Sequence, residues 1–368
     1  MKVLHIAETA KGGVGTIINS LLNINSVESY VLIPDSQSEM ILSGKQYLFK
    51  RDGRNIASLC RLTLESYRVI KKINPDVIHL HSSFAGMIVR TIYLLKLLRK
   101  EKVIIIYTPH AFSFLMNVPS FKKNIFACIE RTLARVTDYI VCTSNYEMDT
   151  ALKYKINRKK TFVIYNGVKV SSLSNTNHSA CLSDEHKSKK IKILFLGRFD
   201  YQKGYDQLLY IIKKLCKSKY HFDIIGEAVN NNSEKINAPN VEYHGWLPQN
   251  ELGLHFSNAD FLIMPSRWES FGLVAVEAQL YGLPVLANKC SSLPEVIDDN
   301  RTGVLLDFSD LESVVDFISK KDKLFWNSKK ELCVKFAQDK FSDKKMELEY
   351  YSLYKNEGVI KNGKKFNE

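Results

Sequence analysis

The segment MPSRWESFGLVAVEAQLYGLPVLAN, residues 264–288, joins an apolar run, a polar loop, a glycine and a stretch with helical spacing. The apolar run predicts a strand that ends at Pro265, and Gly272 precedes a helix from Leu273 to about Tyr281. A second apolar run, Pro284–Ala287, predicts the next strand. Strand, helix and strand in this order form the repeating unit of parallel sheets, so the segment predicts an α/β fold.

The same alternation fills both halves of the chain, on either side of the polar, unpatterned residues 171–190. The other expected strands are Lys2–Ala7, Asp76–Leu80, Val103–Thr108, Asp138–Cys142, Thr161–Ile164, Lys192–Leu196, His221–Ile225 and Val241–Tyr243, and the strand that leads into the opening segment begins at Asp260 and spans Asp260–Met264. We therefore predict doubly wound domains at 1–170 and 191–340, a linker at 171–190, a helix within 341–357 and a frayed tail at 358–368.

Composition is that of a globular protein with two domains: 368 residues, 45% hydrophobic and 25% charged. The seven cysteines are scattered, without a CxxC pair or a metal-ligand spacing, so we expect a reducing compartment and mostly buried thiols. We find no secretory signal and no run near the roughly 20 apolar residues of a membrane span. The expected location is the cytoplasm.

The net charge of +13 comes entirely from the first half of the chain. Residues 1–170 hold 25 Lys and Arg against 12 Asp and Glu, whereas residues 171–368 hold 27 of each. Two basic stretches with interspersed apolar residues, Arg90–Lys102 and Phe121–Val136, would suit an anionic membrane surface as amphipathic helices. The alternative is a pair of core-facing helices with solvated basic faces. The asymmetry of charge between the two halves favours anionic lipid as the partner of the basic half, and we find no nucleic-acid-binding motif.

The stretch KGGVGTIINSLL, Lys11–Leu22, resembles the phosphate-binding loop KGGVGKT of certain ATPases. Such a loop needs a lysine for the outer phosphates and a neighbouring hydroxyl for the metal. Thr16 and Ile17 stand at these two positions, which disfavours an ATPase. The glycines still form a turn between an apolar strand and a helical stretch from about Thr16. This turn could present N–H groups to a phosphate, or it could simply be tight.

A second loop at the carboxyl end of a predicted strand carries two cations. Arg198 and Lys203 lie five residues apart in FLGRFDYQKG, residues 195–204. Together they would suit a diphosphate, whose leaving-group charge they would neutralise. The alternative is a solvated loop with incidental charges.

Two glutamates in the opening segment could border the same ligand. Glu269 lies in the loop and Glu277 in the helix, and carboxylates accept hydrogen bonds from sugar hydroxyls. The exposed N–H groups of Leu273 and Val274, after Gly272, would face an anion. Helix stability alone could account for an acidic residue near a helix start, but not for Glu269 in the loop.

The whole pattern resembles that of retaining glycosyltransferases of family 4, whose signature is E-x7-E and whose fold is GT-B. The motifs that carry the resemblance are KGGVG at 11–15, HLHSS at 79–83, TPHAFSF at 108–114, TSNYEMDTAL at 143–152, YNGV at 165–168, GRFDYQKG at 197–204, GWLPQNEL at 245–252, ESFGLVAVEA at 269–278, GLPVLA at 282–287 and NRTGVLL at 300–306. Each motif is weak alone, but their order and spacing are specific. The resemblance implies two Rossmann-like domains facing a cleft, with a C-terminal helix that crosses back to the N-terminal domain.

The resemblance also implies roles for individual residues of the second domain. Arg198 and Lys203, beside Gly197, match the pair that holds the donor diphosphate. Glu269 matches the glutamate that contacts the donor sugar near its reacting face. Glu277 matches the one that holds the nucleotide ribose.

Backbone groups and one histidine complete the implied donor site. Leu273 and Val274, after Gly272, match backbone donors to the phosphates. His110 matches the histidine beside the donor sugar. The resemblance thus implies a catalytic set consisting of His110, Arg198, Lys203 and Glu269.

The implied acceptor side lies in the first domain. Gly13 and Gly15 match the glycine loop near the phosphates and the acceptor, which would assign that loop to a sugar nucleotide instead of ATP. Gly12 and His81 match acceptor-side positions loosely. For His79 we favour a histidine packed within the sheet.

The resemblance implies a retaining transfer of a hexose or N-acetylhexosamine from a nucleotide sugar, with UDP favoured over GDP, to a lipid-linked or glycan acceptor. We expect no metal and no cofactor, because there is no DxD motif and the cationic pair can stabilise the diphosphate. The pathway would be capsule, O-antigen, lipopolysaccharide or another surface polysaccharide, at the inner face of the plasma membrane. The alternatives are another GT-B enzyme, such as a nucleotide-sugar epimerase or a phosphorylase, and a non-catalytic relative that binds a nucleotide sugar.

Overall fold

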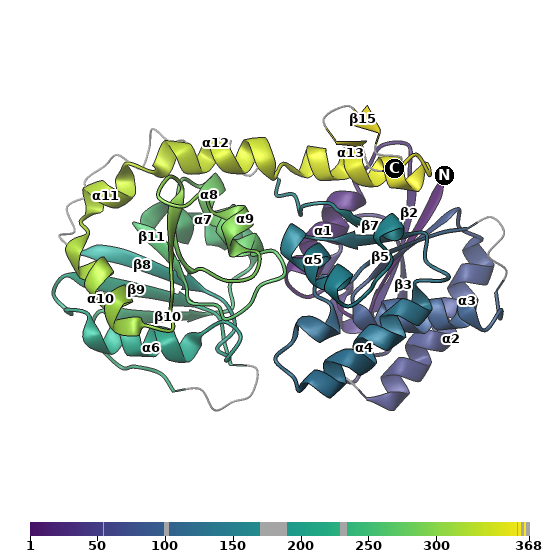
Figure 1. Cartoon of the computed structure of the whole chain (residues 1–368), viewed down its shortest axis with the longest axis horizontal. Helices are drawn as coiled ribbons and strands as arrows, with labels where there is room; N and C mark the ends of the chain where they lie inside the picture. The colour runs from purple at the N-terminus through teal and green to yellow at the C-terminus, as the bar shows by residue number, and fades with distance from the viewer. Residues whose placement is uncertain are drawn as a thin grey trace. The chain divides into compact units, whose positions relative to one another are not determined.

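A computed structural model describes residues 1–53, 55–98, 103–169, 190–228 and 234–358, together with the backbone of 360–361 and 364–365 (Figure 1). The chain divides into two compact units. Unit 1 comprises Met1–Gly167 and Asp343–Glu368, and unit 2 comprises Val168–Ser342. The expected linker at 171–190 lies outside the described residues except for Lys190, as does most of the expected tail at 358–368.

Unit 1 contains a seven-stranded parallel sheet in the order β3-β2-β1-β4-β5-β6-β7. The strands are β1 (Lys2–Ala7), β2 (Glu28–Pro34), β3 (Lys45–Phe49), β4 (Val77–His81), β5 (Ile104–Thr108), β6 (Tyr139–Cys142) and β7 (Thr161–Val163). The helices are α1 (Gly13–Leu21), α2 (Ile56–Ile73), α3 (Ser83–Leu94), α4 (Ser120–Leu133), α5 (Asn145–Lys153) and α13 (Asp343–Tyr354), with short 3-10 turns at η1 (Asp35–Met40), η2 (Ser113–Leu115) and η3 (Arg158–Lys160). Near the C-terminus, β14 (Ile360–Lys361) and β15 (Lys364–Lys365) pair antiparallel.

Unit 2 contains a six-stranded parallel sheet in the order β10-β9-β8-β11-β12-β13. The strands are β8 (Ile191–Leu196), β9 (Tyr220–Ile225), β10 (Val241–Gly245), β11 (Phe261–Met264), β12 (Val285–Asn288) and β13 (Gly303–Leu306). The helices are α6 (Tyr205–Lys214), α7 (Gln249–Asn258), α8 (Leu273–Leu280), α9 (Leu293–Val296), α10 (Leu311–Lys320), α11 (Lys323–Asn327) and α12 (Lys330–Lys340).

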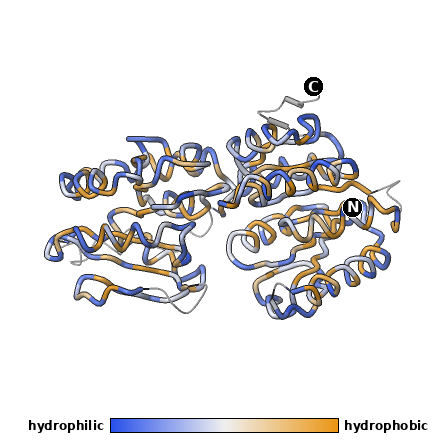
Figure 2. Tube along the Cα trace, turned by 60° about the horizontal axis from the view of Figure 1, so that its bottom comes forward, coloured by the Kyte–Doolittle hydropathy of each residue, from blue (hydrophilic) through white to orange (hydrophobic). Residues whose placement is uncertain are grey.

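The central strands of both sheets are buried on both faces. All five residues of β4 and all four of β11 are buried, as expected of parallel sheets covered by helices. Figure 2 shows apolar stretches along the inner strands and alternating polar and apolar stretches along the helices. The structure confirms the α/β class and the two doubly wound sheets, and it places the carboxyl ends of the parallel strands of each sheet at one edge, where ligands of such folds bind.

The sequence prediction missed the strands β2, β3 and β13. β3 lies at the edge of its sheet and is largely exposed, so no continuous apolar run marks it. β13 is short and begins with a glycine, which weakens the strand signal. β2 does carry a buried apolar run that the prediction overlooked. In addition, α1 begins at Gly13, so the turn is shorter and the helix longer than expected.

The basic stretch Arg90–Lys102 is not one amphipathic helix. The helix α3 ends at Leu94, and Arg90 is fully buried. The guanidinium of Arg90 donates to Glu130 Oε2 at 2.9 Å and lies over the ring of Tyr107, with 3.7 Å between Cζ and the ring centroid. Because a buried cation needs such partners, Arg90 belongs to the core and not to a basic surface. Residues 99–102 lie outside the described part of the chain.

The cysteines are less buried than expected. Of the six that the structure describes, only two are buried; the set comprises Cys142 and Cys333 (buried), Cys290 (half-buried), and Cys60, Cys128 and Cys216 (exposed). All six are free thiols. Among the described helices, none has both the length and the apolar character needed to span a membrane.

The helix α13 completes the core of unit 1, although it follows unit 2 in the sequence. Tyr350 and Tyr354 are both almost fully buried. The Tyr350 hydroxyl lies 3.1 Å from Thr108 Oγ1, and the Tyr354 hydroxyl lies 2.9 Å from His79 Nδ1. The second nitrogen of His79 lies 2.9 Å from Thr108 Oγ1, so this histidine is packed within the sheet, as predicted.

Candidate active site

The loop after β8 packs tightly against the loop after β11 in unit 2. Gly204 has φ 66°, and a Cβ at this position would lie 2.0 Å from the carbonyl oxygen of Pro265. Only glycine fits so close an approach. The Arg267 amide donates to the Gln202 carbonyl at 2.8 Å, and Gln202 Nε2 donates to the Trp268 carbonyl at 3.3 Å. The two charged loops of the sequence analysis are thus held side by side.

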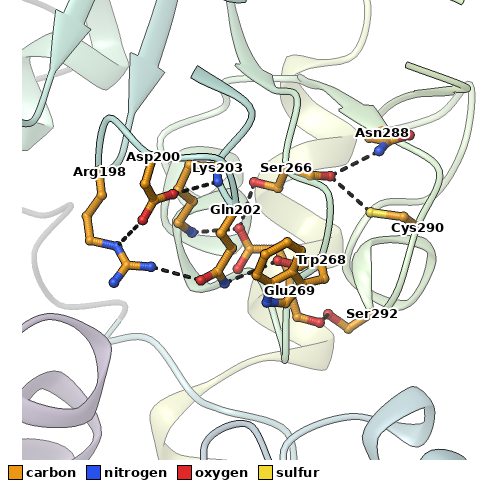
Figure 3. Close-up of polar contacts among 10 residues, drawn as sticks. All are labelled: Arg198, Asp200, Gln202, Lys203, Ser266, Trp268, Glu269, Asn288, Cys290 and Ser292. Atoms are coloured by element: carbon orange, nitrogen blue, oxygen red, sulfur yellow. Dashed lines mark hydrogen bonds and ion pairs between the residues drawn. The ribbon is translucent and has the colours of Figure 1, made fainter. Parts of the chain in front are cut away.

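Lys203 and Glu269 form an ion pair between these two loops (Figure 3). The ammonium of Lys203 donates to Glu269 Oε1 at 2.6 Å, and Ser266 Oγ donates to the same oxygen at 2.8 Å. The side chains of Lys203 and Glu269 are 20% and 8% exposed. A charged pair this sheltered is held in a fixed place but retains access to a ligand.

Arg198 lies in the same loop but is more open. Its side chain is 45% exposed, with Nε 3.0 Å from Asp200 Oδ2 and an Nη2 hydrogen bond of 2.8 Å to Gln202 Oε1 (Figure 3). Asp200 also accepts from the Lys203 amide at 2.8 Å, which fixes the turn between the two cations. The structure thus brings both predicted cations to one loop, each held by its own carboxylate.

Three polar residues that the sequence analysis missed donate hydrogen bonds to backbone carbonyls of the loop that carries Glu269. Asn288 Nδ2 and Cys290 Sγ both donate to the Ser266 carbonyl at 3.1 Å. Ser292 Oγ donates to the Glu269 carbonyl at 3.1 Å (Figure 3). The signal that could have found them is their position, because they lie at or just after the end of β12, beside the end of β11.

The helix α8 starts directly after the Glu269 loop. Gly272 has φ 92° and precedes Leu273, the first helical residue. The amides of Leu273 and Val274 belong to the first turn, whose N–H groups have no acceptor within the helix and suit an anion. Glu277 lies one turn further on; burial raises the pKa of its carboxyl to about 7, and Gln249 Nε2 donates to it at 3.3 Å.

In unit 1, His110 follows β5 in a strained turn. His110 and Ala111 have φ of 54° and 142°, a region that non-glycine residues rarely adopt. Glu147, which is fully buried, stabilises this turn: it accepts from the Phe112 amide at 3.2 Å and from the Thr143 amide at 2.8 Å. Glu147 was missed by the sequence analysis, although Ser144 and Glu147 form the S-x-x-E pattern of a helix start, and Ser144 Oγ accepts from the Glu147 amide.

A chain of histidines leads from the half-buried His110 to the buried His81 and His5 in the sheet. His110 Nε2 lies 3.1 Å from His81 Nδ1, and His81 Nε2 lies 3.1 Å from His5 Nδ1. Burial lowers the pKa of His110 to about 4 and that of His5 to about 3, so both imidazoles are neutral at pH 7. His81 has no exposed surface, and its two ring nitrogens contact His110 and His5; its acceptor-side role stays a prediction.

The glycines of the early loop differ in what they do. Gly15 lies inside α1, where a Cβ would be 2.1 Å from the Ala10 carbonyl oxygen, so packing alone requires glycine there. Gly12 has φ 64° and open space around it, and Gly12 and Gly13 are exposed. A ligand could therefore approach Gly12 and Gly13 but not Gly15.

Two family models match complementary parts of the chain. The model described as glycosyl transferases group 1 matches residues 183–332, and the model described as glycosyltransferase family 4 matches residues 35–172. A 41.2 kDa protein in the cps region of Klebsiella pneumoniae is 49% identical over 97% of this chain and 100% of its own length. The chain belongs to the group 1, family 4 glycosyltransferases.

Other relatives of this glycosyltransferase have named substrates or ligands. The UDP-Gal:alpha-D-GlcNAc-diphosphoundecaprenol alpha-1,3-galactosyltransferase of Escherichia coli is 23% identical over 79% of this chain and 82% of its own. A crystal structure of Anabaena HepE in complex with UDP-glucose has a TM-score of 0.76 and 15% identity, covering 97% of this chain and 100% of that one. The latter similarity establishes the shared fold, in agreement with the two Rossmann-like units of GT-B enzymes.

Proposed function

We propose that this glycosyltransferase is a retaining enzyme that moves a hexose or N-acetylhexosamine from a UDP-sugar to a lipid-linked or glycan acceptor during surface polysaccharide synthesis. The observation that carries the proposal is the sheltered Lys203–Glu269 pair beside Arg198 and the start of α8. These groups offer cations and helix N–H groups for a diphosphate and a carboxylate for a sugar hydroxyl. In this proposal Glu277, one turn along the helix, holds the ribose.

The role of the cations follows from the charge that develops on the leaving group. When the bond between the sugar and the diphosphate breaks, negative charge grows on the diphosphate oxygens, and preorganised cations stabilise it. Lys203 is already fixed by Glu269 and Arg198 by Asp200, so neither has to be ordered when the donor binds. Because these cations do the work of a metal, the proposal includes no metal requirement.

The proton of the acceptor hydroxyl needs a base, and the described residues favour the phosphate itself. His110 is the titratable side chain expected beside the sugar, but burial lowers its pKa to about 4. A base with so low a pKa is weak at neutral pH. In the proposed same-face reaction the acceptor oxygen bonds to the anomeric carbon, the bond to the diphosphate breaks, and the departing diphosphate takes the proton.

The choice of donor and acceptor is supported by the named relatives. The Escherichia coli relative uses UDP-Gal and a sugar linked to diphosphoundecaprenol, and the Anabaena structure holds UDP-glucose. The Klebsiella pneumoniae relative lies in a cps region, which supports capsule synthesis over the other surface polysaccharides.

A membrane contact through α4 is the second part of the proposal. Phe121, Ile125 and Ile129 recur every four residues and are 61%, 53% and 38% exposed, so they form an apolar ridge on one face of the helix. Lys122 and Arg131 are exposed on the same helix, and the first half of the chain carries the net positive charge. An apolar ridge with basic neighbours suits the headgroup region of an anionic membrane on the cytoplasmic side.

The test of the catalytic proposal measures nucleotide binding first and transfer second. We expect UDP to raise the melting temperature without added metal, and ATP with Mg²⁺ to have no effect; a ligand at 100 times its Kd stabilises by about 2.7 kcal/mol. Incubation with UDP-sugars and an undecaprenyl-diphosphate sugar acceptor should then give an elongated lipid with the donor's anomeric configuration. An inverted product would refute the retaining mechanism, and UDP binding without acceptor-dependent UDP release would favour a non-catalytic relative. Conversion of the sugar nucleotide without an acceptor would favour an epimerase.

A further inference from the structure

A cluster of histidines and carboxylates lies on the edge of the sheet in unit 2, and none of its residues belongs to the donor site proposed above. β10 is the edge strand of this sheet and pairs only with β9 (Figure 1). His221 and Asp223 are two residues apart on β9 and point to the same face, whereas Phe222 and Ile224 between and after them belong to the apolar core. Glu242 on β10 lies directly beside Asp223 in the parallel register.

The neighbouring carboxylates of Asp223 and Glu242 would be stabilised by a positive charge between them. Asp223 and Glu242 would repel each other across the strand pair, since like charges on adjacent strands are destabilising. Instead of a Lys or Arg, the structure places imidazoles between them. His221 Nε2 lies 3.4 Å from Asp223 Oδ1 and 3.8 Å from Glu242 Oε2.

A β-bulge directs a second imidazole to the same carboxylates. The register of β10 shifts between Tyr243 and Gly245, which makes His244 the extra residue. Its Nε2 lies 3.2 Å from Asp223 Oδ1, and its Nδ1 lies 3.9 Å from Glu242 Oε1. Each ring nitrogen of His244 therefore lies within 4 Å of a carboxylate oxygen.

A third imidazole comes from α7, the helix that follows β10 in the chain. His255 on α7 lies with its ring centroid 4.6 Å from that of His244, and ligand atoms of Asp223, His244 and His255 all lie within 4.8 Å of one another. All three side chains are partly exposed, so an ion in solution could reach them.

We propose that Asp223, His244 and His255 bind one divalent transition-metal ion, with Zn²⁺ as the representative of the class. Two imidazoles and one carboxylate suit Zn²⁺ and its neighbours and do not suit Mg²⁺ or Ca²⁺, which prefer oxygen ligands. Ligand atoms about 2.0–2.2 Å from a tetrahedral ion are separated by roughly 3.3 Å, and the 3.2 Å between His244 and Asp223 fits that spacing. Glu242 Oε1 lies 3.9 Å from the far nitrogen of His244, on the side where carboxylates commonly support a metal-bound imidazole, and His221, 3.4 Å from Asp223, is a candidate fourth ligand.

Among the described residues, a second histidine cluster, formed by His5, His79 and His81, suits an ion less well. All three are fully buried, and both nitrogens of His79 already have hydrogen-bond partners. No described carboxylate takes part in this triad, so the charge of an ion would be uncompensated there.

An ion at the surface site would connect β10 to α7 across the segment between them. That segment leads into Gln249, the first residue of α7, and the side chain of Gln249 hydrogen-bonds to Glu277. The ion would thus have a structural role at one wall of the donor site, apart from the metal-free chemistry proposed for the diphosphate.

The experiment is a titration of tag-free protein, stripped with EDTA and kept reduced, with Zn²⁺ and separately with Mg²⁺. We expect one Zn²⁺ per chain, a higher melting temperature with Zn²⁺, and neither effect with Mg²⁺. His244→Asn and His255→Asn should each weaken Zn²⁺ binding by at least about tenfold. Glu331→Gln, at an exposed carboxylate on α12 away from the cluster, is the control and should bind as the wild type does.

Two results would overturn the proposal. One is Zn²⁺ binding that survives both histidine substitutions, which would assign it to the exposed thiols or to another histidine. The other is the absence of saturable Zn²⁺ binding to wild-type protein. Melting the variants in EDTA separates loss of the ion from loss of the fold, because H255N removes a partly exposed helix side chain and should leave the ion-free protein as stable as the wild type.

Discussion

The buried histidine chain predicts that unit 1 loses stability in mild acid, and the substitution His5→Asn isolates the contribution of one histidine. His5 lies on β1, is fully buried, and has Nε2 without a hydrogen-bond partner. Asparagine removes the titrating group and keeps a polar side chain of similar reach. Val3→Ala on the same strand is the matched control, because it removes buried contacts without changing any charge.

The magnitude follows from the pKa. Burial lowers the pKa of His5 from 6.5 to about 3, so between about pH 7.5 and 5.5 the folded imidazole stays neutral while the unfolded one takes up a proton. The unfolded state binds more protons in this window, and stability therefore falls as the pH falls. The loss amounts to about 1.4 kcal/mol for this one group, a factor of about ten in the unfolding equilibrium. Burial also lowers the pKa of His79, His81 and His110, so their contributions have the same sign.

The assay must report on unit 1 alone. All three tryptophans, Trp246, Trp268 and Trp326, lie in unit 2, so tryptophan fluorescence does not follow the histidine chain. Hydrogen exchange of peptides from β1 and β4 follows the stability of unit 1 directly. The exchange rates must be corrected for the intrinsic effect of pH on exchange. We expect the wild type and Val3→Ala to lose about 1.4 kcal/mol more than His5→Asn between the two pH values. Equal losses in all three would show that His5 titrates in the folded state, and would refute the reasoning.

Three further predictions concern the donor site and the membrane. Lys203→Ala should lower turnover by roughly 10²-fold or more, because it removes a preorganised cation. The control is Lys213→Ala, which should leave turnover unchanged, because Lys213 pairs with the exposed Glu234. Normal turnover of Lys203→Ala would exclude the role assigned to Lys203. Burial raises the pKa of Glu277 to about 7, so its carboxylate forms as the pH rises through neutrality. The KM for the donor should therefore fall over that pH range in the wild type and stay constant in Glu277→Gln. A parallel fall of KM in the variant would exclude Glu277 as the titrating group. Ile125→Glu should reduce binding to vesicles that contain anionic lipid, whereas Leu324→Glu, at an exposed leucine of unit 2, should leave it unchanged; equal binding by all three proteins would remove α4 from the proposal.

The parallel sheets were predictable because their strands are the ones that sequence patterns mark best. β8 and β11 are buried apolar runs followed by loops with glycine or proline, and their positions fall within one residue of the prediction. Edge strands such as β3 face water on most of their residues, so their pattern resembles that of a loop. The burial of Arg90 could not be predicted from the adjacent sequence either, because its ion-pair partner Glu130 lies 40 residues away on another helix.

Within the two loops of unit 2, the charged side chains of the candidate site were the predictable ones. Arg198, Lys203 and Glu269 stood out because a charged loop at the end of a buried strand needs an explanation. Ser266 and Ser292 did not, because serine in a loop is common and only the three-dimensional arrangement shows that both hold Glu269. The roles of the individual donor residues stay predictions until the variants are measured.

The return of the chain from unit 2 to unit 1 has a consequence for biosynthesis. A ribosome synthesises residues 1–167 first, but the helix that places Tyr350 and Tyr354 against the sheet emerges only after all of unit 2 has been made. Until then Thr108 and His79 lack these partners, so the first unit to leave the ribosome is the last to be completed. A chain that terminates after Ser342 but before α13 is complete would contain a finished unit 2 and an unfinished unit 1, and such products should be the ones that proteases remove.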